Sequence, residues 1–271
     1  MVVGLVAALL AAVLFGGLAV VQAAAARRHG LLSPLMALVA GLYLVGWLLH
    51  LVAIARLPLY LAQVGVAAAL VVTALVAAYV MGEPLWRRHW LAVVGLVGGL
   101  SLLAVAAGDV GPSGVTAGTL AVLALCLVAT AGMALVVVRS TGQLGGVLLG
   151  VLAGLAYAGS PIATRALTTF RVDGLAVAAA VCTGLFGLLG FVLYSAALRR
   201  TSVTAATAPL TLLQTVIPAV VGLAFFGDGV RAGWWPAAAA AFAASVAAAV
   251  VLCGARTQLE VHHAETGWME R

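Results

Sequence analysis

Neutral hydrogen-bonding side chains stand inside the long apolar runs of this sequence, and the run 203–226 carries a row of them. They recur at helical spacing and therefore share one helix face: Thr204, Thr207, Thr211, Gln214, Thr215 and Pro218. Polar side chains are costly in hydrocarbon, so such a stripe indicates a pathway through a membrane. We predict that Thr207, Thr211, Gln214 and Pro218 line a substrate path. The alternative is that the stripe joins helices, because Ser, Thr and Gln commonly bond between them.

Aromatic residues form a second candidate surface. In the run 34–55, Tyr43, Trp47 and His50 fall at i, i+4 and i+7, and Tyr157 shares a face with Pro161 and Thr164 further along the chain. Aromatic faces can bind organic cations or planar metabolites. The predicted path therefore includes Tyr43, Trp47, His50 and Tyr157. Three polar residues of other apolar runs are added to it, namely Gln22, Gln63 and Thr73. Tyr and Trp could instead only mark the membrane interface.

Titratable groups that could couple transport to an ion are few. His50 is the only side chain in the apolar runs that ordinarily titrates near neutral pH. Glu83 and Asp228 follow two apolar runs and could bind an ion or act as a gate. They could equally be interfacial anchors, paired with Arg87, Arg88 or Arg231.

The sequence offers no nucleophile with a base, no paired carboxylates, no zinc-ligand spacing and no phosphate loop in context. Cys126, Cys182 and Cys253 are scattered through apolar runs and suggest neither disulfides nor a metal site. We therefore expect no enzyme activity, no metal and no cofactor.

The composition identifies the elements that must position these residues. Of 271 residues, 65% are hydrophobic and 7% are charged, against about 45–50% and about 25% in soluble domains. Nine apolar segments follow one another, at 2–24, 34–55, 59–81, 90–107, 115–138, 145–167, 174–198, 203–226 and 234–253. Each has roughly the 17–25 residues of a membrane-spanning helix. The predicted fold class is an all-α integral membrane protein with about nine transmembrane helices.

Arginine placement predicts the orientation. Nine of the 13 Arg residues fall on the side of the C-terminus and four on the other side, and the sequence has no Lys. The positive-inside rule then puts the N-terminus outside and the C-terminus in the cytoplasm. The predicted location is the inner (cytoplasmic) membrane of the cell. The first segment has no basic region before it and ends at Arg27 and Arg28, so we interpret it as a retained helix rather than a cleaved signal.

An internal repeat is found when the sequence is shifted by 145 residues. Gly82-Glu83 then meets Gly227-Asp228 and Trp90 meets Trp235, so the second to fourth segments match the seventh to ninth. The shift covers five segments, an odd number, so the matched units point in opposite directions, as in many secondary transporters. We predict a first repeat at 1–110 with about four helices, a second repeat at 111–253 with about five, and a short cytoplasmic tail at 254–271.

A family resemblance is visible in these landmarks. They are Leu57-Pro58 through Gly82-Glu83-Pro84-Leu85 and Trp90, then Ala197-Leu198-Arg199-Arg200-Thr201-Ser202, Pro209, Pro218 and Phe226-Gly227-Asp228. The pattern resembles the EamA-type repeats of the drug/metabolite transporter superfamily. Members usually have five helices in each repeat, whereas this chain has four plus five. The nine-helix layout, with Gln22 and a basic pair closing the first helix, is similar to the NIPA-like magnesium-transporter branch.

The resemblance implies a gradient-driven or facilitative transporter of a small solute, most simply a metabolite or drug exporter working by alternating access. Magnesium transport is the first alternative, although the apolar segments contain no carboxylate, which magnesium prefers. A membrane subunit or scaffold that transports nothing is the second. The expected partners are the lipid bilayer and a small-molecule substrate, without nucleic acid, and a homodimer is left open.

Overall fold

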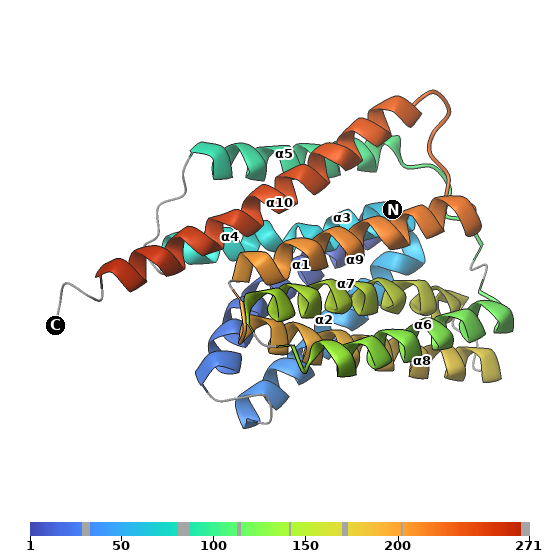
Figure 1. Ribbon diagram of the computed structural model, residues 1–271. Coiled ribbons are helices and arrows are strands. Elements are labelled where there is room, and N and C mark those ends of the chain that lie inside the picture. The colour runs from blue at the N-terminus through green and yellow to red at the C-terminus, as the bar shows by residue number, and fades with distance from the viewer. Residues whose placement is uncertain are drawn as a thin grey trace.

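The computed structural model describes residues 1–28, 33–80, 87–112, 115–140, 142–169, 173–201 and 203–266. Helices make up most of this part of the chain (Figure 1). They are α1 (Val2–Arg28), α2 (Pro34–Arg56), α3 (Leu59–Ala67), α4 (Ala69–Val80), α5 (Arg87–Ala106), α6 (Ala117–Val137), α7 (Gln143–Thr164), the 3₁₀ turn η1 (Arg165–Thr169), α8 (Gly174–Leu198), α9 (Val203–Phe225) and α10 (Trp235–Thr266).

Eight of the described helices are long and apolar enough to cross a membrane. This agrees with the predicted class, an all-α multi-pass membrane protein. The prediction of one continuous helix at 59–81 is wrong, because the chain divides there at Ala68 into α3 and α4. The N–H of Ala68 bonds to the carbonyls of both Val64 (3.1 Å) and Gly65 (3.2 Å), which tightens the turn and interrupts the regular α-helix.

Polar residues between the apolar runs determine where several helices begin. Ser33 and Asp173 each accept a backbone N–H from the first turn of the following helix, and Thr116 forms a reciprocal cap with Thr119. The C-terminal ends of two helices differ from the ends of the predicted apolar segments. The backbone of α10 continues helically to Thr266, and α7 stops at Thr164, three residues before the predicted end.

Helix α7 lies at the centre of the bundle. Of its membrane-spanning window 72% is buried, against 22% for α6, whose Leu125 and Val128 side chains face outward. Large apolar side chains are likewise exposed on α1, α2, α5 and α8, as expected of a surface solvated by lipid. Helices α5 and α10 lie side by side along one edge of the bundle (Figure 1).

Glycines bring α7 and α9 into close contact, as their four-residue spacing predicts. A Cβ on Gly150 would lie 2.6 Å from the Ala206 carbonyl oxygen, and one on Gly154 would lie 2.8 Å from the Cα of Leu210. A third glycine, Gly146, meets Thr201 in the same way. Gly142, Gly146, Gly150 and Gly154 step by four along the sequence, and this spacing predicts close helix packing. The prediction is confirmed for the last three, whereas a Cβ on Gly142, which precedes α7, would meet no atom within 4 Å.

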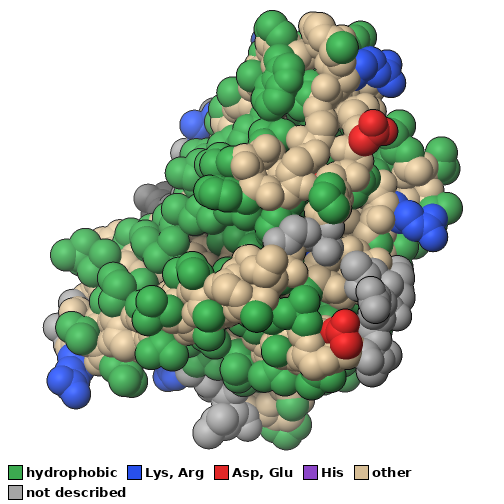
Figure 2. Space-filling model, turned by 90° about the vertical axis from the view of Figure 1, so that its right-hand side faces the viewer, with side chains coloured by type: hydrophobic (Ala, Val, Ile, Leu, Met, Phe, Trp, Pro, Cys, Tyr) green, Lys and Arg blue, Asp and Glu red, His purple; other side chains and the backbone are tan. Residues whose placement is uncertain are grey.

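The connections gather at two ends of the bundle. The α2–α3 turn, the α5–α6 loop and the α9–α10 loop meet at one end, which we call the 226–234 end after its longest described loop. At the other end, Arg200 donates to the carbonyls of Val138 and Ser140 in the α6–α7 connection. Figure 2 looks onto the 226–234 end, where a few charged side chains stand among hydrophobic ones.

Candidate functional site

A buried hydrogen-bonded group joins α1, α2 and α8. The Gln22 side chain is fully buried, and its Nε2 donates to Ser195 Oγ at 2.9 Å. Its Oε1 accepts from the Tyr43 hydroxyl, also at 2.9 Å. A buried amide is stable only when both its donor and acceptor are used, so these three side chains fix one another.

Aromatic rings surround this group. The Tyr43 ring stacks on Phe15, with centroids 5.6 Å apart, and meets the edge of Phe191 at 5.9 Å. Tyr157 lies near both Tyr43 and Tyr194. The hydroxyls of Tyr194 and Thr207 are 2.7 Å apart. We call this set the central cluster, and it consists of Gln22, Tyr43, Tyr157, Tyr194, Ser195 and Thr207.

The central cluster unites four residues of the predicted path, which are Gln22, Tyr43, Tyr157 and Thr207. Sequence reasoning missed Tyr194 and Ser195. Both lie within an apolar run of α8, where two adjacent polar residues give no periodic signal, so only the packing of α8 reveals them.

The other predicted residues on α2 lie along the same helix, beyond Tyr43. His50 is buried, and its Nε2 is 3.4 Å from Gln63 Nε2 on α3. Trp47 Nε1 and His50 Nδ1 are buried without a hydrogen-bond partner in the described structure. The predicted α2 face therefore turns inward and carries two donor positions that a bound polar molecule or water could satisfy.

The predicted stripe on α9 also faces inward. Thr207, Thr211 and Thr215 are at most 5% exposed, whereas Leu212 is 41% exposed. Gln214 is half-buried and Pro218 is buried. Thr211 and Thr215 line a narrow crevice between α3, α9 and α10 that has no room for a water molecule. The side chain of Thr73 and all of Glu83 lie outside the described residues.

A cysteine scan tests whether the stripe lines a path or only packs. In a variant without Cys126, Cys182 and Cys253, we expect cysteines at positions 207, 211 and 214 to react with small water-soluble thiol reagents. The reason is that an opening of the bundle would bring water to this face. Cysteines at 212 and 216, on other faces, should remain protected. Equal protection at all five positions would make the stripe a packing surface.

A second polar site is a buried ion pair at the 226–234 end. The Arg165 guanidinium bonds to the Asp228 carboxylate, and the two side chains are 1% and 0% exposed. The interpretation of Asp228 as an interfacial anchor beside Arg231 is therefore wrong. The α9–α10 loop turns back into the bundle after Gly227, which has a φ of 69°, and this turn directs Asp228 inward.

Backbone groups complete the coordination of both charges. Arg165 donates to the carbonyls of Ile54 (3.0 Å), Leu57 (3.4 Å) and Gly111 (3.2 Å). Asp228 accepts the N–H of Leu59 at 2.6 Å and that of Gly111 at 3.1 Å. Each charge thus meets the helix end of opposite polarity, because Leu57 follows the last turn of α2 and Leu59 begins α3. The sequence did give a signal, since Arg165 is the one charged residue inside a predicted apolar segment.

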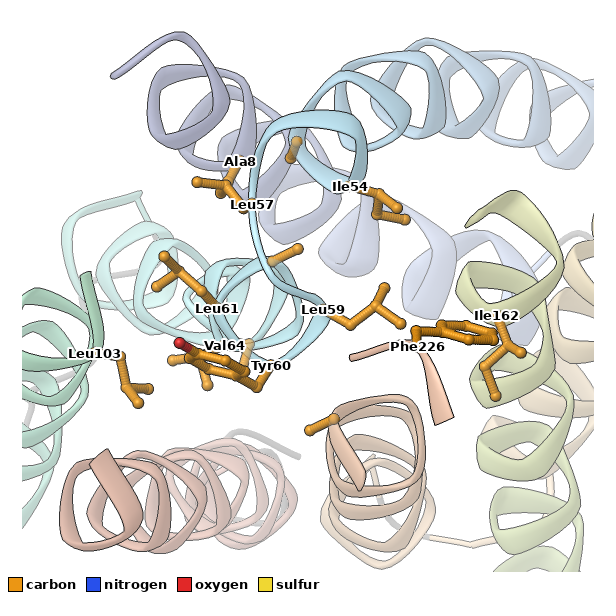
Figure 3. Packing of buried hydrophobic residues seen from close by; sticks show 14 of the residues in the cluster. Ala8, Ile54, Leu57, Leu59, Tyr60, Leu61, Val64, Leu103, Ile162 and Phe226 are labelled. Atoms are coloured by element: carbon orange, nitrogen blue, oxygen red, sulfur yellow. The ribbon is translucent and has the colours of Figure 1, made fainter. Parts of the chain in front are cut away.

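Both side chains of the ion pair are almost fully buried, and Leu59, whose N–H bonds to Asp228, belongs to the apolar core. Figure 3 shows Leu59 beside Phe226, with Ile162 next to Phe226. On the other side, an open concavity of about 780 Å³ is lined by Arg56, Asp109 and Arg231 and by glycines of the two loops. Gly227 and Gly229, which flank Asp228, belong to this lining, so the pair lies directly beneath its floor.

Among the described residues, no group of three or more His, Cys, Asp or Glu side chains could hold a metal ion. Comparison of the chain with protein-family models, with curated proteins and with solved structures finds no match. The described structure thus has two buried polar sites, which are the central cluster and the Arg165–Asp228 pair.

Proposed function

We propose that this chain is a secondary transporter that moves a small solute through the centre of the bundle by alternating access. The observation that carries this proposal is the central cluster. Its hydroxyls, amide and aromatic rings come from five helices and lie deep inside an otherwise apolar bundle. Buried polar side chains in a membrane protein are a functional hypothesis by default.

The order of helix neighbours supports two inverted repeats, at 1–110 and 111–253. Under the 145-residue match, α2, the α3–α4 pair and α5 correspond to α8, α9 and α10. Helix α1 packs against α2, α3 and α4, just as α7 packs against α8 and α9. The counterparts α3 and α9 pack against each other, and so do α5 and α10. In transporters of this design the substrate binds near the midplane between the repeats, where Gln22 of one repeat meets Ser195 of the other.

The chemistry of the central cluster favours an organic solute. Aromatic faces bind planar or cationic organic groups, and the hydroxyl and amide groups can exchange their mutual hydrogen bonds for bonds to a ligand. Magnesium is a weaker candidate. It requires oxygen ligands that include carboxylates, and the buried carboxylate of Asp228 is already bonded by Arg165.

The proposal is tested in two steps. A thermal-shift screen of the purified protein in detergent, across metabolites, drugs and divalent cations, identifies a ligand because binding to the folded state raises its stability. Flux of that compound is then measured in proteoliposomes that contain only this chain. We expect Ser195→Ala to weaken binding about tenfold, since it removes a hydroxyl that would exchange its bond to Gln22 Nε2 for a bond to the ligand. Ser101→Ala is the matched control, because Ser101 is exposed and bonds only within α5. If no compound gives a thermal shift or a flux, the result favours a scaffold that transports nothing.

The orientation is part of the proposal. The distribution of arginine supports placing the 226–234 end outside and the opposite end, which carries Arg139, Arg199 and Arg200, in the cytoplasm of an inner membrane. Reporter fusions should then place residues 84–89 and the chain after Arg256 inside, with residue 1 outside. A cytoplasmic N-terminus would require a different division into repeats.

His50 is the proposed coupling residue. It lies on the inward face of α2 and close to Gln63, and a proton carrier must titrate where substrate and proton both have access. We expect His50→Gln to fold and still to exchange substrate, but to lose the acceleration caused by an imposed pH gradient. Uptake in proteoliposomes with and without the gradient measures this. Undiminished acceleration would exclude His50 and leave Glu83, Asp228, another ion or facilitated diffusion.

A further inference from the structure

The ion pair clamps the two proposed repeats together at the 226–234 end. Arg165 and Asp228 both belong to the second repeat, yet together they bind the backbone of Ile54, Leu57 and Leu59 in the first. The α2–α3 turn is therefore held by side chains that it does not itself supply.

A second connection between the same repeats lies beside the ion pair. Ala107 and Val230 form an isolated antiparallel bridge, and the Gly108 N–H donates to the Gly229 carbonyl at 3.2 Å. The hydroxyl of Tyr60 donates to this same carbonyl at 3.1 Å. Separation of the repeats at this end would break these bonds together with those of the ion pair to the α2–α3 turn.

The energetics suit a contact that opens and closes. A buried ion pair gains little over the same two ions in water, because desolvation offsets their attraction. Since Arg165 and Asp228 lie on the same repeat, they would stay paired when the α2–α3 turn moved away. Water from the concavity above would then replace the backbone partners of both ions. The open state is thus solvated rather than left with bare charges.

We propose that the Arg165–Asp228 pair is the gate that closes the solute path at the 226–234 end, with the concavity as its vestibule. This inference rests on the proposed transport function. It assigns a gating role to Arg165, and it defines the moving contact as the bonds between this pair and the α2–α3 turn.

The test measures access from the vestibule to a residue beneath the gate. Ala163 of α7 is fully buried, two residues before Arg165, and a cysteine there would be a small change. In a variant without the three native cysteines, Ala163→Cys is treated from the 226–234 side with a membrane-impermeant sulfonated maleimide. Modification of residue 163 is followed by mass spectrometry. We expect Asp228→Asn to speed modification at least fivefold. The control Asp109→Asn removes an exposed carboxylate of the vestibule and should change the rate less than twofold.

A disulfide provides the opposite perturbation and does not depend on the stability of Asp228→Asn. Ala107 and Val230 are bridge partners, and cysteines at such positions have a spacing suited to a disulfide. In the Ala107→Cys/Val230→Cys variant, oxidation should slow modification of residue 163 at least tenfold, and reduction should restore it. An unchanged rate after oxidation would overturn the gate, even if proteoliposomes show flux. If modification of residue 163 slows on oxidation and recovers on reduction, the gate is supported. This measurement needs no substrate, so an absence of flux in proteoliposomes would count only against the proposed function.

Discussion

Arg165→Met should lower the free energy of unfolding by about 3–5 kcal/mol, the usual cost of removing one partner of a buried ion pair. The variant leaves the Asp228 carboxylate without a counter-charge and the carbonyls of Ile54 and Gly111 without their donor. Unfolding of the purified protein in detergent measures the loss. Arg231→Met is the control, since Arg231 is exposed at the same end and lies against the Trp234 ring. We expect it to change stability by less than about 0.5 kcal/mol.

The double variant Arg165→Met/Asp228→Asn separates the ion pair from its surroundings. The amide oxygen that this variant places at position 228 can still accept the Leu59 N–H, and no charge remains buried. The double variant should therefore cost about 1–3 kcal/mol less than the sum of the two single variants. Additive losses would contradict a direct coupling between the two side chains.

Gly150→Val should destabilise the protein by about 1–3 kcal/mol, the typical cost of overpacking a tight core. The added side chain would collide with the backbone of Ala206, which cannot turn aside as a flexible side chain could. Helix α9 would have to move away from α7, and the central cluster contains residues of both helices. The loss is measured by the same unfolding assay.

Gly184→Val is the matched control for this prediction. Gly184 lies within α8, where a Cβ would meet no atom within 4 Å. Valine is at least as good a helix former as glycine, so this variant should be as stable as the parent protein. Equal losses at positions 150 and 184 would mean that the effect comes from the substitution itself rather than from contact with α9.

The sequence predicted those features that periodicity controls. Composition identified a helical membrane protein, and the four-residue spacing of Gly146, Gly150 and Gly154 predicted a close helix contact. The inward face of α2 was also predictable, because Tyr43, Trp47 and His50 recur at helical spacing. In the last two cases the information lies within one helix and follows from its repeat of 3.6 residues.

Features that depend on chain reversal could not be predicted in this way. Asp228 pairs with Arg165 across 63 residues because the α9–α10 loop folds back, and no local pattern encodes that path. The division at Ala68 lies in a uniformly apolar run, where hydropathy does not distinguish a tight turn from a continuous helix. Ser195 meets Gln22 across 173 residues, so its role emerges only from the packing of α8 against α1.

The separation of Arg165 and Asp228 along the chain also has a consequence for biosynthesis. During translation, Arg165 leaves the ribosome 63 residues before its counter-ion Asp228. Until α9 and the loop after it have been made, the nascent protein therefore has an uncompensated guanidinium and an unsecured α2–α3 turn. Completion of α9 and its loop then neutralises that charge and joins the early helices to the late ones. Nascent chains arrested before α9 should accordingly be preferred substrates of membrane quality-control proteases, while chains that extend past residue 234 should escape them.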